Sequence, residues 1–413
     1  MSNRRMPAGG RIARHVSALP PSGIRKFFDL VTATPDVVSL GVGEPDFLTP
    51  WTIREQAIYE IERGRTTYTS NHGLIELRRA LSGWLEKRYD AAYNPADEIL
   101  ITVGASEAID LALRALLNPG EEVIVIQPCY VSYAPTVVLA GGKPVIFPTH
   151  QKDGFRIDFG ALLPLITRRT RAIIINYPNN PTGATFNRND LEQLAAFACR
   201  QDLVILSDEI YAELTYDARH ISLASLPGMK ERTILISGFS KAHAMTGWRI
   251  GYACAPPDII TAMVKIHQYT IMCAPTLSQY AALEAINECD DDIVSMREQY
   301  DMRRQFIVRE FNAIGLKTLM PEGAFYAFVS IQNTGMSSEE LCAGLLHDEK
   351  VAVVPGTAFG ACGEGFIRAS YASSYENLEL AMERMGRYVA RIKHDAHKGA
   401  PCRHNHPHGM RMP

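Results

Sequence analysis

A single lysine, Lys241, lies among small and apolar residues in the stretch "SGFSKAHAMTGWRIG", and Arg249 follows eight positions later. Its amine could attack a carbonyl group and form a Schiff base, or it could be an ordinary solvated charge. Other polar side chains also follow apolar runs. Asn180 comes after "IIINYP", and Asp208 lies in "LVILSDE" with Tyr211 three residues later. On a helical turn Asp208 and Tyr211 would face the same way.

Each of these side chains also has an ordinary structural explanation. Asp208 could cap a helix, Asn180 could form a turn, and Lys241 could be solvated. A possible anion site favours a shared ligand over these separate explanations. Ala105 and Ser106 follow "LITVG" and open a helical segment, where free backbone N–H groups can bind phosphate. Because all of these groups follow successive apolar runs, we expect one common site.

Seven short apolar runs rich in Val and Ile recur between about residues 95 and 256, most of them separated by helical segments such as "SEAIDLALRALLN". This alternation predicts an α/β fold with a mostly parallel seven-stranded sheet between helices. Ligands of such sheets bind beyond the carboxyl ends of the strands. That edge would gather an anion cradle, an amide, a carboxylate, a phenol and an amine.

A phosphorylated pyridine aldehyde matches this set of groups. The amine would react with the aldehyde, the carboxylate would keep the ring nitrogen protonated, and the phenol and amide would contact the ring oxygen. The serines and the arginine would hold the phosphate. A protein that bound only phosphate would need no carboxylate opposite the lysine.

Later parts of the chain predict a second, smaller domain. Helical stretches continue to about residue 313 and a mixed α/β segment to about 392. We expect a flexible N-terminal arm (1–20), a large domain (49–283), a small domain built from residues 21–48 and 284–392, and a disordered tail (393–413). The tail holds five of the twelve histidines, but nothing fixes a coordination geometry, so we expect no metal site.

Composition excludes several classes of protein. The formal net charge of -3 argues against nucleic acid as the main partner. No apolar run approaches the roughly 20 residues that span a bilayer, so we expect no membrane segment. The eight cysteines are scattered, which favours a reducing cytoplasm over a disulfide framework.

Several motifs resemble those of a known family. "SGFSKAHAMTGWRIG", "NNPTG", "SDEIYAEL", "GVGEPDF", "YTSNHGLIELR" and "FIRASYA" occur in this order, and the chain resembles a class I/II aminotransferase from Ser22 to about Arg391. This family has the fold type I architecture and depends on pyridoxal 5'-phosphate. Within it, the chain is most similar to the bacterial and archaeal aromatic and N-acetyl-diaminopimelate aminotransferases.

The resemblance implies a role for each cofactor-binding residue. Lys241 would carry the cofactor and move the substrate proton, Asp208 would pair with the ring nitrogen, and Asn180 and Tyr211 would contact the ring oxygen. Tyr130 in "PCYVSY" would stack on the ring.

The phosphate would be held by the start of a helix and by side chains of the lysine motif. The resemblance assigns these contacts to Ala105, Ser106, Ser240 and Arg249. Some relatives carry a further serine three residues before the lysine, where this chain has glycine, and Ser237 would substitute for it.

The substrate and the partner subunit are also implied by the resemblance. Arg368 would bind the α-carboxylate as a planar guanidinium, with the backbone of Gly43 beside it. Tyr68 would reach the phosphate of a neighbouring subunit, so a homodimer with a shared active site is expected.

The resemblance implies ping-pong transfer of an amino group from an amino acid to a 2-oxo acid. Dicarboxylate-specific relatives place a second arginine in the stretch matching residues 267–279, and this chain has none there. Nearby candidates Ile24, Phe28 and Tyr133 are apolar or aromatic. These features favour an aromatic or other apolar donor, with 2-oxoglutarate as acceptor. Aspartate, alanine and N-acetyl-diaminopimelate remain alternatives.

Three rival classes were weighed against transamination. A carbon–sulfur lyase shares the same fold and site, and would release ammonia and pyruvate from cystathionine without an acceptor. A transcription regulator on this fold would need an added DNA-binding domain, for which the N-terminal arm is too short. A nicotinamide dehydrogenase would need a glycine fingerprint after a strand, which is missing.

Overall fold

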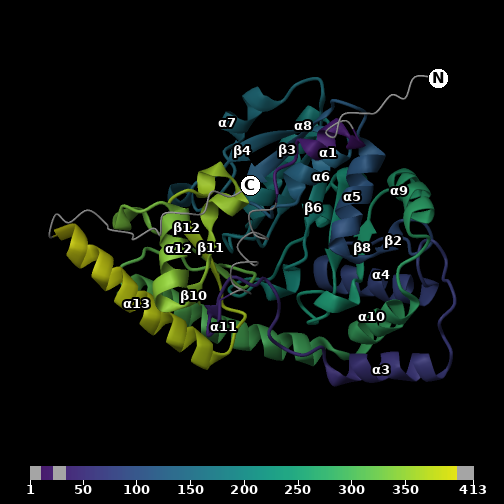
Figure 1. The fold of residues 1–413 in the computed structure, drawn as a ribbon. Helices are drawn as coiled ribbons and strands as arrows, with labels where there is room; N and C mark the ends of the chain where they lie inside the picture. The colour runs from purple at the N-terminus through teal and green to yellow at the C-terminus, as the bar shows by residue number, and fades with distance from the viewer. Residues whose placement is uncertain (1–10, 22–33, 398–413) are drawn as a thin grey trace, which may run out of the picture.

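The computed structural model describes residues 11–21 and 34–397, and its largest element is a seven-stranded sheet (Figure 1). The strand order is β2-β8-β7-β6-β5-β3-β4. The strands are β2 (Ile99–Thr102), β3 (Glu122–Gln127), β4 (Lys143–Pro148), β5 (Thr170–Asn176), β6 (Val204–Asp208), β7 (Thr233–Gly238) and β8 (Gly251–Cys254). Only β8 runs antiparallel to its neighbours. Each strand coincides with one of the apolar runs, so the predicted mostly parallel sheet is confirmed.

Helices cover both faces of this sheet. The helices of this part are α3 (Trp51–Glu62), α4 (Ile75–Tyr89), α5 (Gly104–Leu116), α6 (Tyr133–Leu139), α7 (Phe159–Leu162), α8 (Arg188–Gln201), α9 (Pro257–Thr270) and α10 (Thr276–Glu288). Successive strand side chains point to opposite faces. Ile174 therefore packs with α5, α6 and α9, whereas Ile173 packs with α8. Toward β2, the face opposite α5 packs against α4 and α10.

A smaller unit combines the start and the end of the described chain. Its strands are β1 (Val38–Ser39), β9 (Tyr326–Ser330), β10 (Val351–Ala352), β11 (Val354–Pro355) and β12 (Phe366–Ser370). β1 pairs with β10 in parallel, and β11-β12-β9 form an antiparallel sheet. Its helices are α11 (Asp290–Ala313), α12 (Ser338–Glu349) and α13 (Tyr375–His397). Figure 1 shows this unit beside the large sheet, with α13 on its outer side.

The predicted domain boundaries remain a prediction. The boundary expected at residues 283 and 284 falls inside α10. The described part of the expected N-terminal arm contains the short helix α1 (Arg14–Ser17), and most of the expected tail lies outside the described residues. Among the described residues, no helix is both long and apolar enough to cross a lipid bilayer.

Candidate active site

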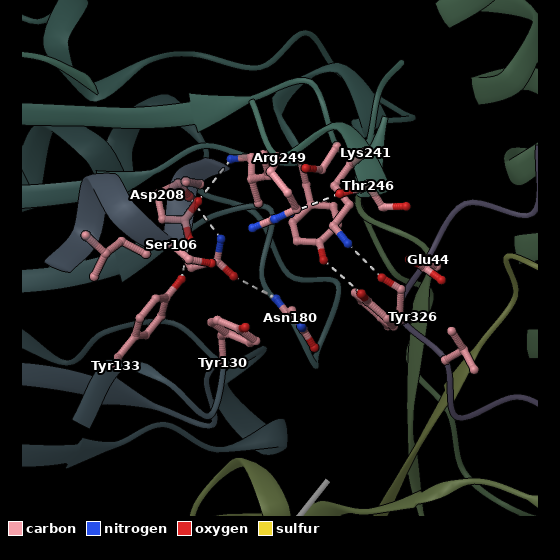
Figure 2. A pocket seen from close by; sticks show the side chains of 18 of the residues that line it. Glu44, Ser106, Tyr130, Tyr133, Asn180, Asp208, Lys241, Thr246, Arg249 and Tyr326 are labelled. Atoms are coloured by element: carbon pink, nitrogen blue, oxygen red, sulfur yellow. Dashed lines mark hydrogen bonds between the residues drawn. The ribbon is translucent and has the colours of Figure 1, made fainter. Parts of the chain in front are cut away.

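A cavity of about 650 Å³ lies beyond the carboxyl ends of the parallel strands (Figure 2). It gathers side chains that follow β3, β5, β6 and β7, the start of α5, and residues of the smaller unit. The predicted site residues that line it are Gly43, Ala105, Ser106, Tyr130, Asn180, Asp208, Tyr211, Ser240, Lys241, Arg249 and Arg368. The structure therefore brings together eleven residues that are as far as 325 positions apart in the chain, counted from Gly43 to Arg368.

Lys241 follows β7 and points into the cavity. Its Nζ donates a hydrogen bond to the Gly43 carbonyl oxygen at 2.7 Å and lies 5.9 Å from the centre of the Tyr211 ring. Burial lowers the pKa of the Lys241 amine to about 8, and Glu44 in the same cavity opposes this shift. Because only the neutral amine is nucleophilic, the lowered pKa makes Lys241 suited to attack an aldehyde near neutral pH.

Asp208 is the last residue of β6 and faces the cavity. Burial raises the pKa of its carboxyl group to about 6, against the effect of two hydrogen bonds. The Tyr133 hydroxyl donates to Oδ2 at 2.6 Å and the Ile210 N–H to Oδ1 at 3.2 Å (Figure 2). A buried carboxylate that keeps free acceptor positions can pair with a protonated ring nitrogen.

Asp208 does not cap a helix, contrary to the structural alternative considered for it. The chain after β6 forms a turn and then the 3₁₀ helix η4 (Ala212–Leu214). The helical turn expected to align Asp208 with Tyr211 is therefore absent, yet both side chains line the same cavity. The Tyr133 side chain, considered from sequence as a substrate-pocket residue, lines the cavity and also donates a hydrogen bond to Asp208.

Arg368 lies in β12 and brings a guanidinium group into the cavity from the smaller unit. Its Nη1 donates to Asn180 Oδ1 at 3.0 Å and its Nη2 to the Gly41 carbonyl at 2.6 Å. Its buried Nε has no hydrogen-bond partner. Within the described part of the chain, no carboxylate lies within salt-bridge distance of Arg368, so this buried cation is available to bind an anion.

The start of α5, which also lines the cavity, has the features of an anion cradle. Helix α5 begins at Gly104, and no side chain caps its first N–H groups. Arg249 lies beside this helix start: a Cβ atom added to Gly104 would be only 2.7 Å from the Arg249 Nη2. Ser106 and Ser240 line the same cavity. Helix N–H groups, hydroxyls and a guanidinium together suit a phosphate.

Two of the predicted residues that the structure describes, Ser237 and Tyr68, do not line this cavity. Ser237 lies in β7 and its hydroxyl donates to the Glu209 carbonyl at 3.2 Å, so it does not replace the serine of some relatives in the phosphate site. Tyr68 is 80% exposed. Ile24, and with it the pocket candidate Phe28, lies outside the described residues.

Three further residues line the cavity although no sequence pattern gave them a role: Tyr326, Glu44 and Thr246. Tyr326 is fully buried in β9, and its phenol oxygen lies 2.8 Å from that of Tyr211 in a hydrogen bond. The available signal was a polar hydroxyl within the apolar run "AFYAFVSI". Glu44 was inside a quoted motif but carried no assigned role.

The residues present fit a phosphorylated pyridine aldehyde. An amine with a lowered pKa, a buried carboxylate and an uncapped helix start beside an arginine occupy separate parts of one cavity. The unpaired Arg368 Nε leaves a further anion-binding position, which a substrate carboxylate can use.

Comparisons with known proteins agree with this chemistry. The family profile "Aminotransferase class I and II" matches residues 35–385. An aspartate aminotransferase of Pyrococcus abyssi is 47% identical over 376 residues, covering 90% of this chain and 97% of the relative. The aromatic-amino-acid aminotransferase 2 of Thermococcus litoralis is 46% identical, also with 90% and 97% coverage. A crystal structure of an aromatic aminotransferase from Pyrococcus horikoshii has 47% identity and a TM-score of 0.85, covering 89% of this chain and 99% of that one.

Proposed function

We propose a substrate class for this chain, which belongs to the class I and II aminotransferases and is a pyridoxal-phosphate-dependent transaminase. The expected family, the subgroup of aromatic and N-acetyl-diaminopimelate aminotransferases, the fold and the cofactor are thereby confirmed. Within the family, we propose that the donor is an L-amino acid with an aromatic or other apolar side chain. The proposed acceptor is a 2-oxo acid such as 2-oxoglutarate.

Bound pyridoxal 5'-phosphate supplies an aldehyde that accepts the amino group and a ring that withdraws electrons. We propose that Lys241 holds it and moves the proton of the substrate Cα, and that Asp208 keeps the ring nitrogen protonated. Asn180 and Tyr211 would contact the ring oxygen, and Tyr130 would cover the ring. The start of α5, Ser106, Ser240 and Arg249 would hold the phosphate.

The proposed amino donor is inferred from the cationic side chains of the cavity. Among the described residues that line it, only Lys241, Arg249 and Arg368 are basic. Each has a proposed task, at the aldehyde, the phosphate and the substrate α-carboxylate respectively. Among these described lining residues no cation remains for a distal carboxylate, and Glu44 adds a carboxyl group to the same cavity. A dicarboxylic donor would therefore bury an unpaired charge, which is unfavourable.

The test is to mix the holoenzyme with one donor at a time and follow the absorbance of the bound cofactor by stopped flow. Phenylalanine and tyrosine should convert the cofactor at least about tenfold more efficiently than aspartate or glutamate, since an unpaired buried charge costs more than ~1.4 kcal/mol. Faster conversion by aspartate would contradict the proposal. Aspartate is the second candidate, because the Pyrococcus abyssi relative is named for it.

Acceptors require a separate measurement, because 2-oxoglutarate carries the same distal carboxylate as glutamate. The enzyme is first converted with phenylalanine, and 2-oxoglutarate, phenylpyruvate and pyruvate are then added individually. We expect 2-oxoglutarate to restore the original cofactor spectrum, but less efficiently than phenylpyruvate, because the same unpaired distal charge would be buried. Release of pyruvate and ammonia from cystathionine without any acceptor would identify a lyase instead.

We also propose that the enzyme acts as a homodimer. Tyr68, Tyr269, Ile271 and Met272 are large apolar side chains that are exposed on the single chain. Asn71 donates a hydrogen bond to the Met272 carbonyl at 2.8 Å, which holds the two segments together. An exposed apolar patch of this kind is typical of a protein interface. Light scattering should give twice the mass of the chain, and Tyr68→Phe should weaken cofactor binding only in the dimer.

A further inference from the structure

Tyr326 lines the same cavity as Lys241 (Figure 2) and has three close neighbours in the proposed site. Its phenol oxygen lies 2.8 Å from that of Tyr211. Its ring lies 4.5 Å from the Arg368 guanidinium carbon. A Cβ atom on Gly43, whose carbonyl accepts the hydrogen bond of Lys241, would lie 2.6 Å from the Tyr326 hydroxyl. Tyr326 is fully buried in β9 of the smaller unit, whereas Tyr211 and Lys241 belong to the large sheet.

The hydroxyl of Tyr326 determines what the hydroxyl of Tyr211 can do. A phenol has one proton to donate and lone pairs that accept. If Tyr211 donates its proton to the cofactor's ring oxygen, its own oxygen must accept the proton of Tyr326. Donors in such a chain polarise one another, so each hydrogen bond strengthens the next. Tyr326 therefore orients the Tyr211 proton toward the cavity.

The ring of Tyr326 has a separate effect on Arg368. This guanidinium is 3% exposed and, within the described ranges, has no carboxylate partner. Its charge lies over two aromatic rings, 4.5 Å from the centre of the Tyr326 ring and 4.8 Å from that of Phe359. Aromatic faces stabilise a cation without neutralising it. Arg368 is thus held in place while its charge stays available for an incoming carboxylate.

We propose that Tyr326 is a positioning residue that connects the two halves of the site: its hydroxyl directs the Tyr211 hydroxyl to the cofactor, and its ring holds Arg368 for the substrate carboxylate. The inference rests on the proposed roles of Tyr211 and Arg368. It physically links cofactor binding to substrate binding, because one side chain of the smaller unit contacts both Tyr211 and Arg368.

Two substitutions separate the hydroxyl from the ring. Tyr326→Phe removes only the hydroxyl, and Tyr326→Met removes the ring while an unbranched side chain fills the space. Tyr371→Phe is the matched control, because Tyr371 is also fully buried and its hydroxyl donates to the Ala324 carbonyl at 3.1 Å, away from the cavity. The holoenzymes are compared by the pH midpoint of the cofactor absorbance change and by the Kd for 3-phenylpropionate, an unreactive carboxylate.

Tyr326→Phe should raise the pH midpoint by about 0.5 to 1 unit, because a weaker hydrogen bond to the ring oxygen disfavours the deprotonated form. Its Kd for 3-phenylpropionate should stay within about twofold of wild type, since the phenylalanine ring keeps the cation–π contact. Tyr326→Met should raise the midpoint similarly and weaken 3-phenylpropionate binding by about 3- to 30-fold. Tyr371→Phe should change neither quantity.

Tyr211→Phe separates a failure of this inference from a failure of its premise. If Tyr211→Phe raises the midpoint and Tyr326→Phe does not, the inference about the hydroxyl is overturned. If Tyr211→Phe has no effect either, the proposed role of Tyr211 is wrong, and the inference falls with it. Unchanged 3-phenylpropionate binding in Tyr326→Met overturns the role of the ring. If Tyr326→Met does not fold, Tyr326→Phe still tests the hydroxyl, since it keeps the buried ring.

Discussion

Removing the Tyr133 hydroxyl should weaken cofactor binding in a way that depends on pH. This hydroxyl donates to Asp208 Oδ2 at 2.6 Å, and within the described chain the other donor to that carboxylate is the Ile210 N–H, at 3.2 Å. Burial raises the Asp208 pKa to about 6, and the Tyr133 hydrogen bond opposes this rise. In Tyr133→Phe the opposition is lost, so the pKa of Asp208 should rise further.

The size of the effect follows from the hydrogen bond. A hydrogen bond to a charged group contributes about 1.5 to 3 kcal/mol, which corresponds to a rise of roughly 1 to 2 pKa units. At pH 7 the ionised fraction of Asp208 would then fall from about 90% to between about 50% and 10%. Once Asp208 is ionised, the missing hydrogen bond affects the free and the cofactor-bound protein equally, so its contribution to Kd cancels.

Because the ionised carboxylate is the proposed partner of the ring nitrogen, the Kd for pyridoxal 5'-phosphate should increase about 2- to 10-fold at pH 7. At pH 9 both proteins have an ionised Asp208, and the ratio of their Kd values should be below about 1.2. The direction of this pH dependence is that of an acid with a raised pKa. As the pH rises, Asp208 ionises and the affinity for the cofactor recovers.

The assay is titration of the apoprotein with cofactor between pH 6 and pH 9.5, followed by absorbance. The two proteins are compared by the ratio of the Kd of Tyr133→Phe to that of wild type. The effect of Lys241 titration on Kd cancels in this ratio, because both proteins contain Lys241. Asp208→Asn is the control, because it has no charge to recover and should bind weakly at every pH. A Kd ratio for Tyr133→Phe that does not change with pH would refute the reasoning.

The remaining predictions concern the lysine, the carboxylate site and the phosphate site. Lys241→Ala should lose covalent attachment of the cofactor, measured by mass spectrometry after borohydride reduction, and transamination should fall by on the order of 10⁴-fold or more. In the apoprotein, attack of Lys241 on an added aldehyde should accelerate with pH around a midpoint of about 8, because burial favours the neutral amine; a midpoint near the usual lysine value would contradict this. Arg368→Lys should lower kcat/KM for phenylalanine by about 10- to 100-fold, since an ammonium group replaces a planar guanidinium that can bind the carboxylate through two hydrogen bonds. Phenylethylamine, which lacks the carboxylate, should change by less than about twofold, and equal losses would argue against the assigned role. Gly104→Ala should weaken cofactor binding, because φ is +73° there and a Cβ would contact Arg249; Gly141→Ala, with φ +85° and open space around it, shares the strain but should keep the affinity.

The sequence predicted the large sheet and most of the residues at its edge. Continuous apolar runs specify buried strands locally, and each of the seven runs became a strand. Polar residues after such runs, such as Asn180 and Lys241, must lie at the carboxyl edge of a parallel sheet. The resemblance to the family then assigned a role to each of them, and the structure places eleven of these residues around one cavity.

Side-chain direction near the strand ends was not accessible in this way. Ser237 and Ser240 are three residues apart, yet only Ser240 lines the cavity, because Ser237 still belongs to β7 and points to the Glu209 carbonyl. The segment after Asp208 reads as a helix but forms a turn and η4. Local propensity does not determine these side-chain directions or the conformation after Asp208, since strand pairing and the packing of neighbouring elements decide them.

The sequence by itself determined which chemical groups the site would contain, because their types and their positions after apolar runs are local features. Only the tertiary structure decided how these groups are held. Tyr133 meets Asp208 across 75 positions, and Tyr326 meets Tyr211 across 115 positions. The first pair depends on how α6 packs against the large sheet, and the second on how β9 of the smaller unit lies against it. Burial among these elements, and not residue type, lowers the pKa of Lys241 and raises that of Asp208.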